Sequence, residues 1–349
     1  MYRLRYLFVL LTFILSACGP TTRPSDLAAR QSPAAVQPAQ TLAATVAGTQ
    51  LALPLIANQA DATSAPPPTQ QSTQPPAATQ TATATVETPL RFAVIGDYGG
   101  GGIPEFDVAH LIISWQPEFI ITTGDNNYPA GSDTTIDANV GQFFHDYIYP
   151  YQGTYGAGAD KNRFFPTMGN HDWGTASGQP YLDYFTLPGN ERYYDFTWGP
   201  VHFFALDSDS REPDGVNSSS PQAAWLQAGL ADATAPWKIV YMHHPPYSSG
   251  LHGSVDWTRW PYQEWGASAV LTGHDHTYER LVIDGFPYFV NGLGGGAVYQ
   301  FVHVIDGSQV RYNDDYGAML VEATQSRITF QFINRQGEVV DTYSLEKSP

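Results

Sequence analysis

The amino-acid sequence predicts an α/β fold for the part of the chain that begins near residue 89, and three observations support this prediction. A strand, a helix and a second strand follow one another between residues 91 and 124, which is the order of a βαβ unit. Several later apolar runs end in glycine and polar residues, as buried strands do where they enter loops. Residues 318–345 alternate apolar and polar side chains, which is typical of antiparallel strands.

The first βαβ unit carries an aspartate just past the end of each strand. Residues 91–95 form the first predicted strand, which leads to Asp97. Apolar residues then recur at helical spacing across residues 104–115, with a proline in the first turn. A second apolar run, residues 119–121, leads to Asp125. Because neighbouring parallel strands end at the same edge of a sheet, both aspartates could reach one ligand site; two unrelated turn aspartates are the alternative.

Three later strands end in side chains that can bind a metal or contact an anion. They are residues 164–168 before Asn170 and His171, residues 237–242 before His243 and His244, and residues 269–272 before His274, Asp275 and His276. Two histidines at positions i and i+2 point to the same side of an extended segment, so His274 and His276 favour a metal site. A single histidine after a strand is more often structural.

The other predicted elements lack chemical motifs. We expect hairpins at residues 193–206 and 281–290, a surface helix at 222–233, and antiparallel strands at 318–323, 328–333 and 338–345. The glycine-rich residues 292–296 are expected to form a tight turn, because they lack the lysine and the following helix of a phosphate-binding loop. Four histidines have no motif around them and are interpreted as structural: His110, His145, His202 and His303.

Charge and cysteine content exclude several classes of site. The formal net charge of the chain is −17, and residues 1–88 carry four arginines against three acids, so the remainder carries −18. Such an acidic domain repels the polyanionic backbone of nucleic acids and anionic lipid surfaces, which disfavours both as partners. Cys18 is the only cysteine, so neither an intrachain disulfide nor a thiolate metal site is possible. A bound metal would need oxygen and imidazole ligands.

The N-terminal residues predict export and anchoring. Residues 1–18 have a basic start, a short apolar centre and small residues before Cys18, and they resemble a bacterial lipoprotein signal in which that cysteine is lipidated. The alternative is an ordinary export signal. Residues 19–88 are rich in Ala, Thr, Pro and Gln and predict a disordered tether, or alternatively a transient interaction segment. Residues 89–349 would then be the catalytic domain of an extracytoplasmic, membrane-anchored lipoprotein.

Five sequence blocks occur at predicted strand ends. They are Gly96-Asp97-Tyr98-Gly99, Gly124-Asp125-Asn126-Asn127-Tyr128, Gly169-Asn170-His171, Val240-Tyr241-Met242-His243 and Gly273-His274-Asp275-His276. Their order and residue types resemble the calcineurin-like metallophosphoesterases, and the tyrosine of the second block points to the purple acid phosphatase branch. The resemblance extends from Arg91 to about Leu345. It implies a four-layer sandwich, with two mixed β-sheets face to face and helices on the outside.

The resemblance also implies seven metal ligands. Asp97, Tyr128 and His276 would bind the first metal, Asn170, His243 and His274 the second, and Asp125 would bridge them. The fourth-block ligand of the family lies two residues before a proline, which selects His243 over His244. Phenolate and carboxylate suit Fe(III), whereas an amide and two imidazoles suit a divalent ion such as Fe, Zn or Mn.

The implied activity is that of an acid phosphatase. A dinuclear site would hydrolyse phosphate monoesters, small-molecule substrates, by in-line attack of a metal-bound hydroxide. The phosphate-facing histidines of the family match His171 and His252, either of which could protonate the leaving group. Asp172 and Asp275 are either orienting residues or loop acids. The alternatives are a phosphodiesterase or nucleotidase of the same fold and, less favoured, a non-catalytic surface binding protein.

Overall fold

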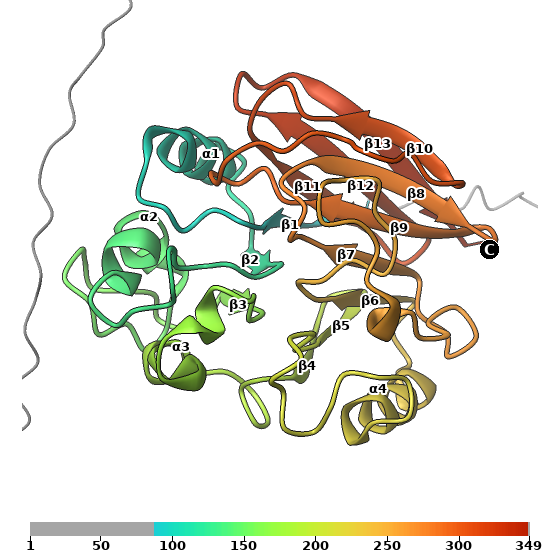
Figure 1. Cartoon of the computed structure of the whole chain (residues 1–349), viewed down its shortest axis with the longest axis horizontal. Coiled ribbons are helices and arrows are strands. Elements are labelled where there is room, and N and C mark those ends of the chain that lie inside the picture. Colours follow the sequence, from blue (N-terminus) through green and yellow to red (C-terminus); the bar gives the residue numbers. More distant parts are fainter. Residues whose placement is uncertain (1–86, 348–349) are drawn as a thin grey trace, which may run out of the picture. The chain divides into compact units, whose positions relative to one another are not determined.

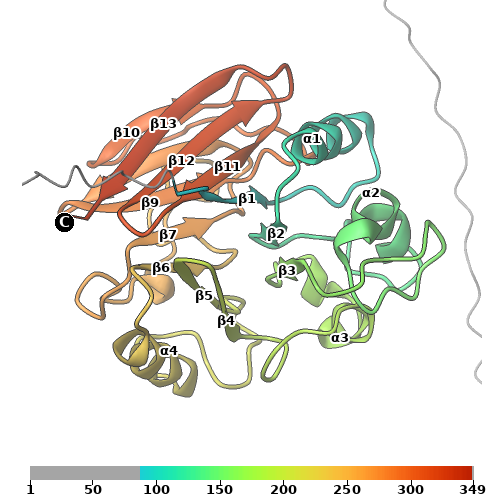
Figure 2. The same ribbon diagram turned by 180° about the vertical axis from the view of Figure 1, so that it is seen from behind.

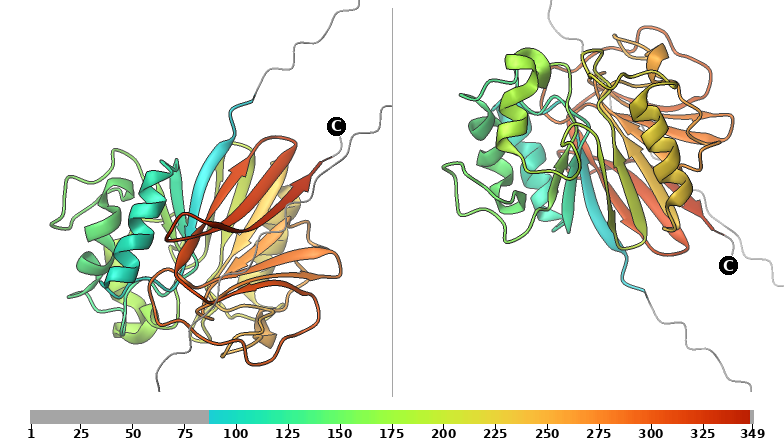
Figure 3. Two further views of the ribbon diagram at one scale, coloured as in Figure 1. Left: turned by 90° about the horizontal axis from the view of Figure 1, so that it is seen from above. Right: turned by 90° about the horizontal axis from the view of Figure 1, so that it is seen from below.

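Two β-sheets packed face to face form the centre of the structure (Figure 1), a computed structural model that describes residues 87–347. The first sheet has six strands in the order β13-β12-β11-β1-β2-β3, and the second has seven in the order β10-β8-β9-β7-β6-β5-β4. Each sheet contains parallel and antiparallel pairs. The predicted class of two mixed sheets with helices outside is therefore confirmed, as the two views of Figure 3 also show.

The strands have three to eight residues. Those of the first sheet are β1 (Leu90–Ile95), β2 (Phe119–Thr122), β3 (Phe164–Pro166), β11 (Gly317–Ala323), β12 (Arg327–Asn334) and β13 (Val339–Glu346). Those of the second are β4 (Tyr194–Trp198), β5 (Val201–Ala205), β6 (Trp237–Tyr241), β7 (Ala269–Thr272), β8 (Tyr278–Ile283), β9 (Phe286–Asn291) and β10 (Ser308–Tyr312). Strands β1, β2 and β3 run parallel, and so do β5, β6, β7 and β9.

The helices lie outside the two sheets (Figure 2). The α-helices are α1 (Ile103–Ser114), α2 (Gln142–Phe144), α3 (Gln179–Tyr184) and α4 (Pro221–Asp232). A π-helical turn η1 (Asp137–Gly141) precedes α2, and the 3-10 turns are η2 (His145–Tyr147), η3 (Asp172–Gly174), η4 (Ala176–Gly178) and η5 (Asp256–Thr258). No helix among residues 87–347 is long and apolar enough to cross a membrane.

Alternation along β5 explains how one sheet contributes to two cores. Successive side chains of a strand face opposite sides of the sheet. Phe203 therefore points between the sheets, where its ring centroid lies 5.0 Å from Phe92 and 5.3 Å from Phe119. Phe204 points the other way and packs with Leu226 and Leu230 of α4. Aromatic rings thus hold the sheets together, and a separate apolar layer holds α4 on the outer face.

Most predicted elements are present, and the differences have local reasons. The βαβ unit, both hairpins, the surface helix and the three antiparallel strands at the end of the chain are confirmed. The sequence did not predict β10 or the short helices between residues 137 and 184. These pieces are six residues or shorter, too short to establish a periodicity. The predicted signal, lipidation of Cys18 and the tether lie outside the described residues and stay predictions.

A buried acid in the first turn of α1 makes the stability of the fold sensitive to pH. Glu105 is fully buried, and its Oε2 accepts a hydrogen bond from the backbone N–H of Gly101. Its Oε1 has no partner within the described residues. Burial raises the pKa of Glu105 to about 9, and the backbone N–H groups of Gly101 and Gly100 offset only part of this effect.

We predict that Glu105→Gln stabilises the protein above pH 5. Between the ordinary carboxyl pKa and about 9, the folded state keeps a proton on Glu105 that the unfolded state releases, so the stability of the wild type falls as pH rises. The difference in unfolding free energy between E105Q and wild type should grow by about 1 kcal/mol or more from pH 5 to pH 8. Urea denaturation at both pH values measures it, with exposed Glu264→Gln as control. A difference that does not change with pH would contradict the prediction.

Candidate metal centre

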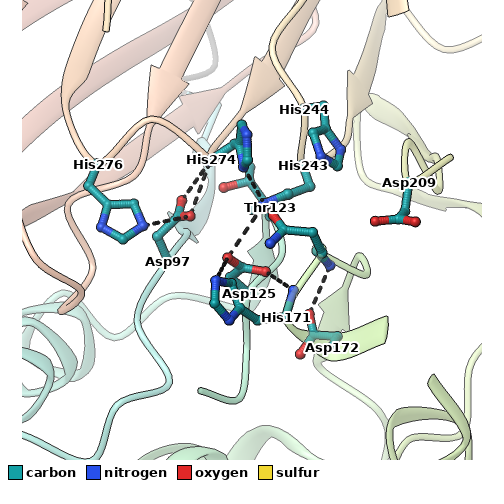
Figure 4. A network of polar contacts seen from close by, with 12 residues as sticks. Asp97, Thr123, Asp125, His171, Asp172, Asp209, His243, His244, His274 and His276 are labelled. Carbon is teal, nitrogen blue, oxygen red and sulfur yellow. Dashed lines mark hydrogen bonds and ion pairs between the residues drawn. The ribbon is translucent and has the colours of Figure 1, made fainter. Parts of the chain in front are cut away.

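The seven predicted ligands lie together at the carboxyl ends of parallel strands. They come from the loops after β1, β2, β3, β6 and β7, so both sheets contribute to one cluster (Figure 4). Asp97, Asp125, His243 and His276 are buried, whereas Tyr128, Asn170 and His274 are partly exposed. The cluster is therefore buried on one side and open to solvent on the other.

The first group of donors contains Asp97, Tyr128 and His276. The phenol oxygen of Tyr128 lies 3.0 Å from Nε2 of His276, and the same nitrogen lies 3.4 Å from Oδ1 of Asp97. One phenol oxygen, one carboxylate oxygen and one imidazole nitrogen thus face a common point. This is the set expected for the first metal ion.

The second group contains Asn170, His243 and His274. Nε2 of His243 lies 3.0 Å from Oδ1 of Asn170 and 3.1 Å from Nδ1 of His274. A single N–H of His243 could serve only one of these two acceptors. A metal ion among them could bind all three atoms, so the residues present fit a cation.

Asp125 connects the two groups. Its Oδ2 lies 3.1 Å from the phenol oxygen of Tyr128 in the first group and 3.6 Å from Nε2 of His243 in the second. The backbone N–H of His171 donates to the other oxygen, Oδ1, at 2.9 Å. Gly169 permits this approach, because a side chain at that position would collide with Oδ1 of Asp125.

Backbone carbonyls set the tautomers of two cluster histidines. Nδ1 of His243 lies 2.9 Å from the carbonyl oxygen of Thr123, and Nδ1 of His276 is bonded to the carbonyl oxygen of Ala297. A carbonyl only accepts, so both Nδ1 atoms carry hydrogen. Nε2, the atom that faces the other donors, is then free to bind a metal ion, as outer partners commonly arrange for metal-binding histidines.

The two buried carboxylates hold protons on neighbouring imidazoles. Burial lowers the pKa of His243, but the carboxylates of Asp125 and Asp97 raise it to a net value above the ordinary one. Burial opposes ionisation of Asp97, but the hydrogen bond with His276 brings the pKa of that carboxyl below its usual range. Burial, with the charges of Asp97 and Asp125, raises the pKa of Tyr128 far above its ordinary value. A bound cation would displace these protons and favour the phenolate.

Three cluster residues adopt backbone conformations that are unusual for residues other than glycine. Asp97 has φ 57°, Asp125 has φ 52° and His274 has φ 70°. Such left-handed conformations cost free energy and concentrate at functional sites. The expectation that His274 and His276 lie on the same side of an extended segment is wrong, because the backbone turns at His274. The turn at His274 lets each histidine join a different group of donors.

The predicted phosphate-facing histidines lie at the exposed margin of the cluster. The ring of His171 packs 4.5 Å from the ring of Tyr128, and its Nδ1 is 2.6 Å from the carbonyl oxygen of Pro129. The ring of exposed His252 stacks on His274 with centroids 4.3 Å apart. Both predicted residues thus lie beside the cluster, His171 against the first group of donors and His252 against the second.

His244 is also part of this neighbourhood. It is buried, its Nδ1 lies 3.0 Å from the hydroxyl oxygen of Ser208, and its ring is 4.5 Å from the ring of His274. Burial and neighbouring His243 lower the pKa of His244 to about 3. A nitrogen of His244 lies within 4.8 Å of donor atoms of His243 and His274, so these three residues form a second possible metal-binding combination.

Two contact residues were missed by the sequence analysis. Nη2 of Arg211 donates to the backbone carbonyl of Asn170 at 3.0 Å, and Nη2 and Nε also donate to the carboxylate of Asp209 at 2.8 and 2.6 Å. The ring of Tyr299 stacks on His276 with centroids 4.1 Å apart and an interplanar angle of 4°. Both lie in irregular loops without periodicity or a motif. The only indication in the sequence was that Arg211 lies in the long segment between the third and fourth sequence blocks.

The fold and the donor cluster together define the class of the protein, a metallophosphoesterase. Residues 90–278 match the sequence profile described as calcineurin-like phosphoesterase, and the chain belongs to that family. This agrees with the five blocks at the strand ends.

Relatives place the chain near the purple acid phosphatases. It is 24% identical over 300 residues to purple acid phosphatase 17 of Arabidopsis thaliana, covering 74% of this chain and 85% of that protein. It is 23% identical to Fe(3+)-Zn(2+) purple acid phosphatase 12 of the same plant, covering 59% of this chain and 47% of the relative. The solved structure of a purple acid phosphatase from yellow lupin shares the fold, with a TM-score of 0.60 and 18% identity over 74% of this chain and 54% of the lupin chain.

One buried acid ties two of the ligand-bearing loops together. The carboxylate of Asp172 accepts hydrogen bonds from the backbone N–H of Asn126 at 3.1 Å, the amide of Asn126 at 2.9 Å and the backbone N–H of Gly169 at 2.8 Å. Asn126 follows Asp125, and Gly169 precedes Asn170. Of the two alternatives for Asp172, the contacts fit an orienting residue.

We predict that Asp172→Asn loosens both loops. The new amide would place N–H groups against the N–H donors of Asn126 or Gly169, at a cost of about 1–3 kcal/mol in unfolding free energy. Metal affinity should also fall, by roughly 10–100-fold, as is typical when an outer partner is lost. Thermal unfolding and metal titration measure the two effects. Exposed Asp183→Asn is the control, and unchanged metal affinity in D172N would refute the orienting role.

Proposed function

We propose that this protein is a dinuclear metal-dependent phosphatase that hydrolyses phosphate monoesters. The observation that carries the proposal is the position of Asp125, whose Oδ2 is close to Tyr128 on one side and to His243 on the other. A carboxylate shared by two groups of three donors suits a pair of ions rather than one. The acid phosphatase relatives support the same reaction class.

The two donor groups differ in chemistry, and this supports two different ions. Asp97 and Tyr128 are hard oxygen donors that favour Fe(III), whereas Asn170 with His243 and His274 favours a divalent ion such as Fe, Zn or Mn. The relative named as an Fe(3+)-Zn(2+) enzyme supports this pairing. When bound, the ions would supply Lewis acidity and lower the pKa of a water molecule.

The remaining roles belong to residues at the open side of the cluster. The backbone N–H of His171 orients Asp125, and Nε2 of His171 is 3.9 Å from Oδ2 of that carboxylate. A ring in this position could contact a phosphate oxygen. His252, on the other side, is exposed and can give a proton to the leaving oxygen of the ester.

The chemistry of the cluster favours an enzyme over a binding protein. All seven donors are retained and point toward one another, and three of them hold strained backbone angles. A surface that only binds a partner would need none of these features. Tyr128, which carries the resemblance to the purple acid phosphatases, favours monoesters over a phosphodiesterase activity.

Elemental analysis and a hydrolysis screen test the proposal directly. We expect the purified protein to contain two metal ions per chain, to absorb visible light through a phenolate–iron bond, and to hydrolyse phosphate monoesters faster than diesters. Preference for diesters would identify a phosphodiesterase of the same fold. Active protein that is colourless and free of iron would refute the iron assignment. Metal-loaded protein that hydrolyses neither monoesters nor diesters would refute the proposed enzymatic activity.

We predict that Tyr128→Phe removes the visible absorption but keeps part of the activity. The substitution deletes the phenol oxygen while leaving Asp97, Asp125 and His276 to hold the first ion. Absorption spectra and initial rates of the metal-loaded variant measure the two properties. Tyr155→Phe, which changes an exposed tyrosine outside the cluster, should leave both properties unchanged. An unaltered spectrum in Y128F would mean that another group gives the colour.

A further inference from the structure

Asp275 links the metal cluster to the loop that carries His252. It is fully buried, and a candidate metal ligand lies on either side of it in the chain. Its Oδ1 accepts a hydrogen bond from the backbone N–H of His252 at 2.7 Å, and its Oδ2 accepts one from the backbone N–H of Gly253 at 3.1 Å and another from the hydroxyl of Ser248. The carboxylate therefore contacts both ends of residues 248–253.

The loop is shaped around this carboxylate. The backbone N–H of Gly250 donates to the hydroxyl oxygen of Ser248 at 3.0 Å, which closes the loop on itself. A Cβ atom at Gly250 would lie only 2.4 Å from Cγ of Asp275. Glycine is thus needed at this position for the backbone to approach the acid.

The same contacts determine where the imidazole of His252 lies. Asp275 fixes the backbone of His252, and the ring then stacks on His274 at 4.3 Å and meets the ring of Tyr299 edge-on at 5.3 Å. His252 is exposed and has no side-chain hydrogen bond within the described residues. Its position therefore depends on the loop backbone and on ring packing.

We propose that Asp275 is a positioning residue that fixes His252 for proton transfer to the leaving group, an inference that rests on the proposed function. As the ester P–O bond breaks, the proton of His252 goes to the leaving oxygen, and the oxygen of a water molecule forms the new bond to phosphorus. The proton that this water releases goes to solvent, and His252 takes up a proton from solvent before the next turnover. A displaced loop would leave metal binding intact and impair only the proton transfer. Asp275 acting merely as a loop acid would instead affect every substrate equally.

Leaving-group dependence distinguishes these roles. An alkyl phosphate needs a proton on its leaving oxygen, whereas the acidic nitrophenol of p-nitrophenyl phosphate leaves without one. In Asp275→Asn, kcat should fall about 10–100-fold for the alkyl phosphate and by less than about threefold for p-nitrophenyl phosphate, with metal content unchanged. Adding the substitution to His252→Ala should give no further loss, because both act on one step.

Two further variants distinguish the proposed effect on the loop from a general effect of misfolding. Gly250→Ala keeps the acid but pushes the loop away from it, and it should show the same selective loss. Asp341→Asn is the matched control, since that buried carboxylate also accepts hydrogen bonds, from Tyr278 at 2.9 Å and Arg280 at 2.7 Å, and none of them reaches the loop. It should change stability without changing the ratio of the two substrates.

Hydrogen exchange separates a failure of this inference from a failure of the proposed function. The amide protons of His252 and Gly253, which bond to Asp275, should exchange slowly in the metal-loaded wild type and at least about tenfold faster in D275N, whether or not the protein hydrolyses phosphate esters. Equal loss on both substrates, a further loss in the double variant, or unchanged exchange would each overturn the positioning role.

Discussion

A hydrogen bond between the two sheets is the interaction on which the site depends. The backbone N–H of His274, after β7 of the seven-stranded sheet, lies 2.9 and 3.1 Å from the two oxygens of Asp97, after β1 of the six-stranded sheet. Asp97 is fully buried, and the bond can form only while the aromatic layer holds the sheets in register. Neither sheet carries a complete set of donors, and the packing of Phe92 against Phe203 is therefore a condition for the cluster.

Electrostatics explains why this arrangement calls for cations. Asp97, Asp125 and Asp172 are all buried at one end of the sandwich, in a domain with a large negative charge. Burial and the charge of Asp125 raise the pKa of Asp172 to about 7, although three N–H groups bind it. The protein alone can balance this charge only by holding protons on imidazoles and carboxyls. Metal ions would replace those protons, which links the stability of the site to pH and to metal supply.

Sequence reasoning succeeded where the chain is periodic and failed where it is not. An apolar run followed by glycine located Asp97 and Asp125, and the five blocks located the other candidate ligands, because short parallel strands place their ends predictably. The left-handed backbone at His274 could not be inferred, since residues other than glycine rarely adopt it. Arg211 and Tyr299 reach the cluster from irregular loops, and only the folded chain shows which loops meet.

The donors of the cluster stand within a few residues of strand ends, whereas the segments between them are long. Thirty-five residues, which include η1, α2 and η2, separate Tyr128 from β3, and twenty-five residues separate His243 from β7. Outside residues 248–253, which carry His252, these two segments could therefore be exchanged, shortened or extended while the strand ends keep the seven candidate ligands together. The fold thus separates the proposed metal centre from most of the chain around it, and a designer could graft new recognition loops onto it while keeping His252 and the strand-end donors in place.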